Sequence, residues 1–145
     1  MSRSGYSEDF DCEGTGGLWR GAVERAIRGK RGQAFLREMA AALDAMPVKE
    51  LVAGVLVEDG AACAIGAVAL SRGLDVSGLD ETKPDDVAST FGIAPALAKE
   101  IAYENDECSP WRPRDQPAES RAQRWTRMRA WVASQLRDER EEQKR

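Results

Sequence analysis

Few residues of this chain could do chemistry, because histidine is absent from its 145 residues. Most nucleophilic hydrolases and most catalytic zinc sites use an imidazole as base or ligand, so the sequence disfavours these classes. Cys63 is one remaining candidate, since a cysteine at the start of a helix can react as a thiolate. It lies in the apolar run Ala61-Ala62-Cys63-Ala64-Ile65, where we expect a small buried residue without a catalytic role.

A second candidate is the polar run Glu104-Asn105-Asp106-Glu107, whose oxygen atoms could hold a hard cation. A calcium loop spaces its ligands along about twelve residues and includes a glycine at the turn. Here the acidic residues are contiguous, so their side chains cannot all converge on one ion. We expect the end of a helix followed by a solvated turn, and we predict no metal, no cofactor and no enzymatic activity.

A third pattern, in residues 86–103, has the spacing of a helix-turn-helix, with Gly92 in the turn and Ile101 on the packed face of the second helix. DNA readers present arginine or lysine to phosphates. The second helix offers only Lys99, in a segment (residues 41–110) whose four basic and thirteen acidic residues give a charge of −9. We therefore expect two packed helices here and no reading of DNA by the second one.

The basic residues are concentrated in two segments, although the chain as a whole has a formal net charge of −4. Residues 15–40 and residues 111–145 each have a net charge of +4. Such segregation is typical of surfaces that bind a partner, although ordinary solvated faces give the same pattern. An exposed tryptophan beside arginine is also a typical interface anchor. The predicted partner-binding residues are Arg28, Lys30, Arg31, Trp111, Arg124, Arg127 and Trp131.

The elements that position these residues are predicted to be mainly α-helical. We expect a compact bundle of five or six helices with one short β-hairpin near residues 50–62, where β-branched residues precede the turn signal Asp59-Gly60. A helix that continues through Leu51–Val57 is the competing interpretation. Pro84 and Pro95 are expected to open helices, and Gly73 and Gly92 to end them. The expected helices cover about residues 18–27, 33–46, 63–70, 84–91, 96–104 and 118–140.

The last expected helix has an apolar stripe formed by Trp125, Met128, Val132 and Leu136. This stripe could pack on the core of the same chain, or it could pair with a second copy and make a homodimer through the C-terminal helix. The sequence is compatible with both arrangements.

The chain is predicted to form a flexible N-terminal segment (1–16), a single helical domain (17–140) and a frayed charged tail (141–145). Its three cysteines are widely spaced and odd in number, which is typical of reduced thiols in a cytoplasm. No stretch approaches the roughly 20 apolar residues that span a bilayer, and the first residues lack the features of a signal peptide. We expect a cytoplasmic protein without a membrane partner.

Four motifs follow one another in a characteristic order. They are Leu18-Trp19-Arg20-Gly21-Ala22-Val23, the turn Asp59-Gly60 before Cys63-Ala64-Ile65-Gly66-Ala67, Phe91-Gly92-Ile93, and Asn105-Asp106. This order resembles that of small, mostly uncharacterised proteins of tailed bacteriophages and prophages. Members of that group often have a second cysteine beside the first, whereas alanines flank Cys63 here.

The resemblance implies a phage context and no particular activity. Small phage proteins, anti-CRISPR proteins among them, often act by stoichiometric binding. We therefore expect a non-catalytic protein that binds and blocks a bacterial protein or nucleoprotein complex in the host cytoplasm, in host takeover or anti-defence. The alternative is a nucleic-acid-binding accessory or regulatory protein that uses the basic patches and a helix-turn-helix-like core.

Overall fold

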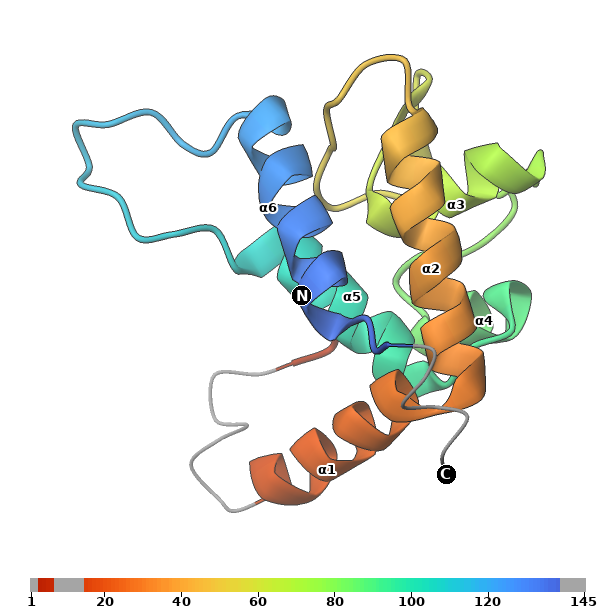
Figure 1. Ribbon diagram of the computed structural model, residues 1–145. Helices are drawn as coiled ribbons and strands as arrows, with labels where there is room; N and C mark the ends of the chain where they lie inside the picture. The colour runs from red at the N-terminus through yellow and green to blue at the C-terminus, as the bar shows by residue number, and fades with distance from the viewer. Residues whose placement is uncertain (1–2, 7–14, 139–145) are drawn as a thin grey trace.

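The computed structural model describes residues 3–6 and 15–138, and it confirms a mainly α-helical fold with a short hairpin (Figure 1). Within these residues the chain forms six helices and one two-stranded antiparallel sheet. The elements are α1 (Thr15–Arg28), α2 (Lys30–Ala45), β1 (Val57–Glu58), β2 (Ala61–Ala62), α3 (Ala64–Arg72), α4 (Pro84–Phe91), α5 (Pro95–Glu107) and α6 (Arg121–Gln135).

Most predicted proline and glycine signals mark real boundaries. Pro84 and Pro95 lie in the first turns of α4 and α5. Gly73 and Gly92 end α3 and α4 with left-handed backbone, which glycine adopts without steric cost. The Asp59-Gly60 turn joins β1 to β2 with Val57 opposite Ala62, as expected for a two-residue hairpin.

The break between α1 and α2 is narrower than predicted. Only Gly29 separates the two helices, and α2 begins at Lys30 instead of Gln33. The buried side chain of Gln33 donates to the carbonyl of Ile27 at 2.8 Å. This bond satisfies a carbonyl at the end of α1, so the next helix can start directly.

The last helix, α6, is shorter than predicted at both ends. It begins at Arg121, because Ser120 and Gln123 form a capping box. It ends at Gln135, whose carbonyl accepts from Gln33 Nε2 at 3.0 Å, while the Arg137 amide donates to Gln33 Oε1 at 2.8 Å. A buried glutamine of α2 therefore holds the C-terminal end of α6.

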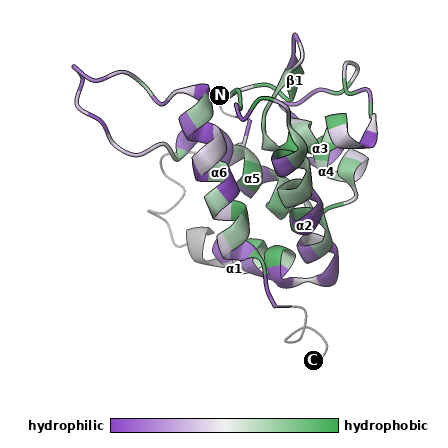
Figure 2. Ribbon diagram, turned by 45° about the horizontal axis from the view of Figure 1, so that its top comes forward, coloured by the Kyte–Doolittle hydropathy of each residue, from purple (hydrophilic) through white to green (hydrophobic). Residues whose placement is uncertain are grey.

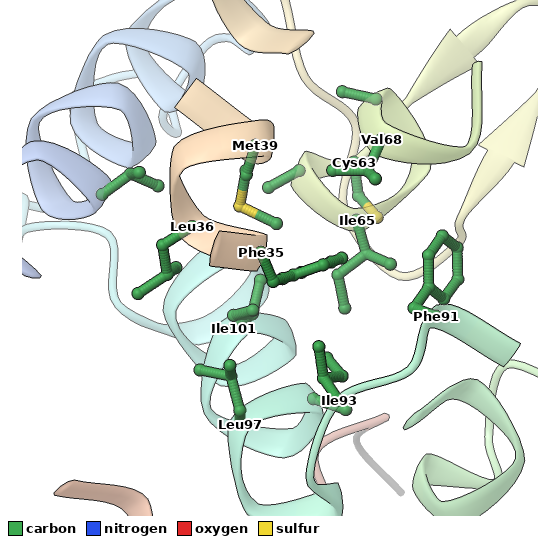
Figure 3. Packing of buried hydrophobic residues seen from close by; sticks show 14 of the residues in the cluster. Phe35, Leu36, Met39, Cys63, Ile65, Val68, Phe91, Ile93, Leu97 and Ile101 are labelled. Carbon is green, nitrogen blue, oxygen red and sulfur yellow. The ribbon is translucent and has the colours of Figure 1, made fainter. Parts of the chain in front are cut away.

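The core lies where α2, α3 and α5 meet (Figure 3). Leu36 and Met39 of α2 and Ile101 of α5 are among its fully buried side chains. Phe35 packs edge-on against Phe91 of α4, with ring centroids 6.1 Å apart. The helices therefore enclose one continuous apolar cluster, and α4 covers part of it.

A glycine stands at position 66 of α3 because the hairpin segment lies directly on this part of the helix. A Cβ atom at Gly66 would be 1.9 Å from the carbonyl oxygen of Leu56. The sequence predicted that another backbone passes close to Gly66, and the structure confirms this contact.

The apolar stripe of α6 packs on the core of the same chain. Met128 and Val132 are fully buried, and Trp125 and Leu136 pack against the cluster from its edge. Trp125 Nε1 also donates to the carbonyl of Leu43 at 3.2 Å. None of the helices in the described ranges is both long and apolar enough to span a membrane.

Candidate functional site

Among the predicted partner-binding residues, Trp111 is the exposed tryptophan. Its side chain is 86% exposed and lies on the loop of residues 108–120, which joins α5 to α6. This loop, which we call the tryptophan loop, projects from the bundle and is mostly hydrophilic (Figure 2). Its three prolines restrict the backbone, so the ring is presented on a chain segment with few conformations to lose.

Two arginines accompany Trp111 on the tryptophan loop. The Arg112 guanidinium bonds to the Pro117 carbonyl at 3.5 Å and to Gln123 Oε1 at 3.2 Å, which ties the loop to the start of α6. Arg114 is exposed. The loop therefore contains an exposed tryptophan and two arginines, residue types that are enriched in protein interfaces.

A second group of predicted residues lies at the corner between α1 and α2. Arg28, Lys30 and Arg31 are exposed there, and Arg28 makes a loose surface ion pair with Glu24 at 3.7 Å. This corner lies at the opposite end of the bundle from the tryptophan loop (Figure 1). The structure therefore does not bring the two groups together in one site.

The remaining predicted residues have structural contacts. Arg127 makes a bidentate pair with Glu119, at 2.7 and 3.0 Å, and donates to the carbonyls of Glu104 and Asn105 at the end of α5. These contacts, chiefly the bond from Arg127, lower the pKa of the Glu119 carboxyl. Arg124 donates to the Leu51 carbonyl at 3.0 Å. Both arginines hold α6 in place.

Trp131 also differs from Trp111. It is half-buried and packs against the core cluster. We predicted partner binding for both tryptophans, and the structure gives Trp111 the exposure that such a role needs. Of the two tryptophans, Trp111 is therefore the one that a partner can reach.

The run Glu104-Asn105-Asp106-Glu107 lies at the end of a helix, as predicted, but it does not form the solvated turn that was expected there. It forms the last turn of α5, and Asn105 is only 1% exposed. Asn105 Oδ1 accepts from the Ala64 amide at 3.1 Å, and its Nδ2 donates to the Val52 carbonyl at 2.9 Å. These hydrogen bonds offset the free-energy cost of burying the amide, so the helix can continue past Glu104.

Sequence reasoning missed this polar cluster, although a signal for it exists. Asn105 follows the buried residues Leu97 and Ile101 at i, i+4 spacing, so it continues the buried face of α5. An amide at such a position needs hydrogen-bond partners within the core. The spacing therefore predicts a structural asparagine.

Arg3 completes the polar cluster from the N-terminal segment. Its Nε and Nη2 atoms each lie 2.8 Å from a carboxylate oxygen of Asp106, and Nη1 lies 3.5 Å from Cys63 Sγ. Ser4 is also buried and donates to Glu107 at 3.0 Å. The sequence predicts a flexible segment over residues 1–16 that Tyr6 and Phe10 could attach to the body. Residues 3–6 lie against the body, where the Tyr6 hydroxyl donates to Glu100 at 3.1 Å, and residues 7–14 are outside the described part.

Cys63 is buried, as predicted, and caps α3. Its sulfur accepts from the Gly66 amide at 3.4 Å, and the Arg3 guanidinium lies on it. Burial, with the neighbouring Glu104, raises the pKa of Cys108 to about 11, which disfavours its thiolate. Cys12 lies outside the described residues. In the part of the chain that is described, no three Cys, Asp or Glu side chains are placed to hold a metal ion.

The Arg3–Asp106 pair makes the stability depend on pH. Burial would raise the pKa of Asp106, but the bonds from Arg3, Asn105 and Gly54 lower it below its ordinary value. The stabilisation is therefore present above the unfolded-state pKa of about 3.9 and is lost as the pH falls through the lower folded-state pKa.

We expect Asp106→Asn to lower the free energy of unfolding at pH 7 and to reduce its decline with falling pH below about pH 4. Urea denaturation of both proteins over this range measures the difference, and Glu119 contributes equally to each. If the free energy of unfolding declined equally with falling pH in both proteins, Arg3 would not be keeping the Asp106 carboxylate ionised.

Comparisons of the chain with protein-family models, with curated proteins and with solved structures give no match. The fold and the exposed residues therefore carry the functional argument.

Proposed function

We propose that this protein is a phage-encoded, non-catalytic interaction protein that binds and blocks a bacterial protein or nucleoprotein complex in the host cytoplasm, in host takeover or anti-defence. The observation that supports it best is the exposure of Trp111 on the tryptophan loop. The phage context comes from the resemblance of the sequence motifs.

An exposed indole ring favours association with a partner. Tryptophan has a large apolar surface, and covering it by a partner is favourable. The prolines of the tryptophan loop reduce the entropy that binding must remove. Arg112 and Arg114 follow Trp111 in the chain, and arginine, like tryptophan, is enriched in protein interfaces. The loop is thus suited to act as an anchor.

Capture from bacterial lysate tests the proposal. Tagged wild-type protein should retain a partner at physiological salt, and Trp111→Ala should reduce its affinity at least about 30-fold, as expected for a hot-spot residue. Gln116→Ala, an exposed change on the same loop, is the matched control and should retain the partner. Because Trp111 is exposed, its substitution should leave the thermal unfolding midpoint unchanged.

Two outcomes would contradict the proposal. One is the absence of any specifically retained protein with the wild type. The other is a partner that Trp111→Ala retains as well as the wild type, because binding would then not use the tryptophan loop.

A second candidate is a nucleic-acid-binding accessory or regulatory protein. It is favoured by the exposure of Arg28, Lys30 and Arg31 at the α1–α2 corner. The helix-turn-helix-like part does not support it, because α5 lies inside the bundle, with Glu100 buried and Lys99 over the ring of Trp19 at 4.7 Å.

The basic corner makes a measurable prediction for this candidate. If it contacts phosphates, changing its three basic residues to alanine should weaken DNA or RNA binding and reduce the salt slope by up to about three units. Fluorescence anisotropy at several salt concentrations measures this, with Lys83→Ala, an exposed lysine elsewhere, as control. An unchanged salt slope would show that the α1–α2 corner does not contact the phosphates.

A further inference from the structure

An apolar groove of about 510 Å³ lies on a surface separate from the tryptophan loop. It is bounded by the end of α2, the chain that follows it, the tip of the hairpin and one side of α3. Its size falls in the range of sites that accommodate several apolar groups. We call it the α2–α3 groove.

Small side chains make this groove hollow. Its lining includes Ala42 and Ala45 of α2, Ala61 of the hairpin and Ala67 of α3. Pro47 prevents α2 from continuing, so the chain leaves the helix at Met46 and forms one wall. Larger residues at these positions would fill the space.

Two exposed apolar side chains line the groove. Within the described residues, the large hydrophobic side chains that are exposed are Val48 (59%), Leu70 (48%) and Trp111. Val48 and Leu70 both line the α2–α3 groove. Apolar residues gathered in a concave surface mark a binding site more strongly than isolated exposed ones.

The charged residues that line the groove are both acidic. Its charged lining residues are Glu50 and Asp59, and Glu58 adjoins Asp59 in the hairpin. Within the described part of the chain, none of these three carboxylates makes an ion pair.

The neighbouring basic residues are already engaged. The Lys49 ammonium bonds to the carbonyls of Asp44 and Met46 and lies over the Trp125 ring. The Arg72 guanidinium makes a bidentate pair with Glu38, at 2.6 and 2.8 Å. The Lys49 and Arg72 side chains are thus held by other groups, and the charged residues that line the groove itself are both acidic.

We propose that the α2–α3 groove binds a cationic amphipathic segment of another protein, which places an apolar side chain between Val48 and Leu70 and its lysines or arginines beside Glu50 and Asp59. The apolar floor provides burial, and the carboxylates select positive flanks. The proposal goes beyond the function proposed above, because no residue of the groove belongs to the tryptophan loop.

Selection from a random dodecapeptide library tests the chemistry of the occupant. Full-length wild-type protein is the target, and Leu70→Gln, which keeps the helix and removes the apolar surface, is the counter-target. The enriched peptides should combine leucine, isoleucine or an aromatic residue with nearby lysine or arginine. Enrichment of acidic peptides, or no enrichment that depends on Leu70, would overturn the proposal.

A fluorescent copy of the most enriched peptide then gives affinities. Leu70→Gln and Val48→Thr should each raise Kd at least about tenfold, as for other buried interface anchors. Glu50→Gln combined with Asp59→Asn should raise it several-fold at low salt and less at high salt. Asparagine suits position 59, where φ is 51°.

Matched variants distinguish binding in the groove from binding at the tryptophan loop and from dimerisation. Glu24→Gln removes an exposed carboxylate far from the groove and should leave Kd within twofold of wild type, as should Trp111→Ala. If Trp111→Ala abolished peptide binding, the peptide would bind the tryptophan loop, and the proposal for the groove would be wrong. A wild-type dimer that Leu70→Gln converts to a monomer would show that a second copy covers the groove, and would also overturn the proposal.

Discussion

Replacing Asn105 by leucine should lower the free energy of unfolding by about 2–6 kcal/mol. The Ala64 amide and the Val52 carbonyl would lose their partner in the protein interior. Each buried polar group left without a hydrogen bond costs about 1–3 kcal/mol. Asn105 therefore joins α5 to the start of α3 and to the chain that leads into the hairpin.

Urea denaturation followed by circular dichroism measures this effect. Gln116→Leu makes a similar change of an amide to an apolar side chain at an exposed position, and should shift the free energy of unfolding by less than about 0.5 kcal/mol. If Asn105→Leu were as mild as this control, the polar cluster would not support the fold in the manner described.

Gly66→Ala should destabilise the protein by about 3 kcal/mol, near the upper end of the usual cost of overpacking a core. The added methyl group would meet the Leu56 carbonyl oxygen at 1.9 Å, so the hairpin segment must move away from α3. That movement would disturb the bond from the Cys63 amide to the Leu56 carbonyl, now 3.0 Å.

Gly78→Ala provides the control for this prediction. No atom lies within 4 Å of a Cβ at Gly78, so alanine there should be neutral or slightly stabilising. Thermal and urea denaturation of both variants gives the comparison. Equal stabilities would contradict the close approach of the hairpin segment to α3.

Local signals account for the elements that could be predicted from the sequence. Pro84, Pro95, Gly73 and Gly92 act through their own backbone geometry, so their effect does not depend on distant residues. The hairpin turn at residues 59–60 is local in the same way. Helix type and approximate position follow from such residues together with apolar periodicity.

Distant contacts account for the boundaries that could not be predicted. The end of α6 depends on Gln33, which lies 102 residues before Gln135 in the chain. The last turn of α5 depends on bonds from Asn105 to residues 41 and 53 positions away. Periodicity within a helix contains no information about these partners.

The same limit applies to the candidate binding residues. The sequence identified Trp111 as a tryptophan outside the apolar stripe, and the structure shows it exposed. Arg124 and Arg127 were chosen for their charge, yet their guanidinium groups bond to carbonyls of Leu51 and of the end of α5. Charge alone does not distinguish an arginine that meets a partner from one that closes a helix end.

We propose that this protein blocks its partner by stoichiometric binding, and titration of the captured complex tests this most directly. The activity of the complex should fall linearly and end at about one protein per binding site, without further loss over time. Trp111→Ala should raise Kd at least about 30-fold, so its titration should curve and lose the sharp end point at one equivalent. Complete inactivation by about one-hundredth of an equivalent, progressing with time, would reveal catalytic turnover and contradict the claim.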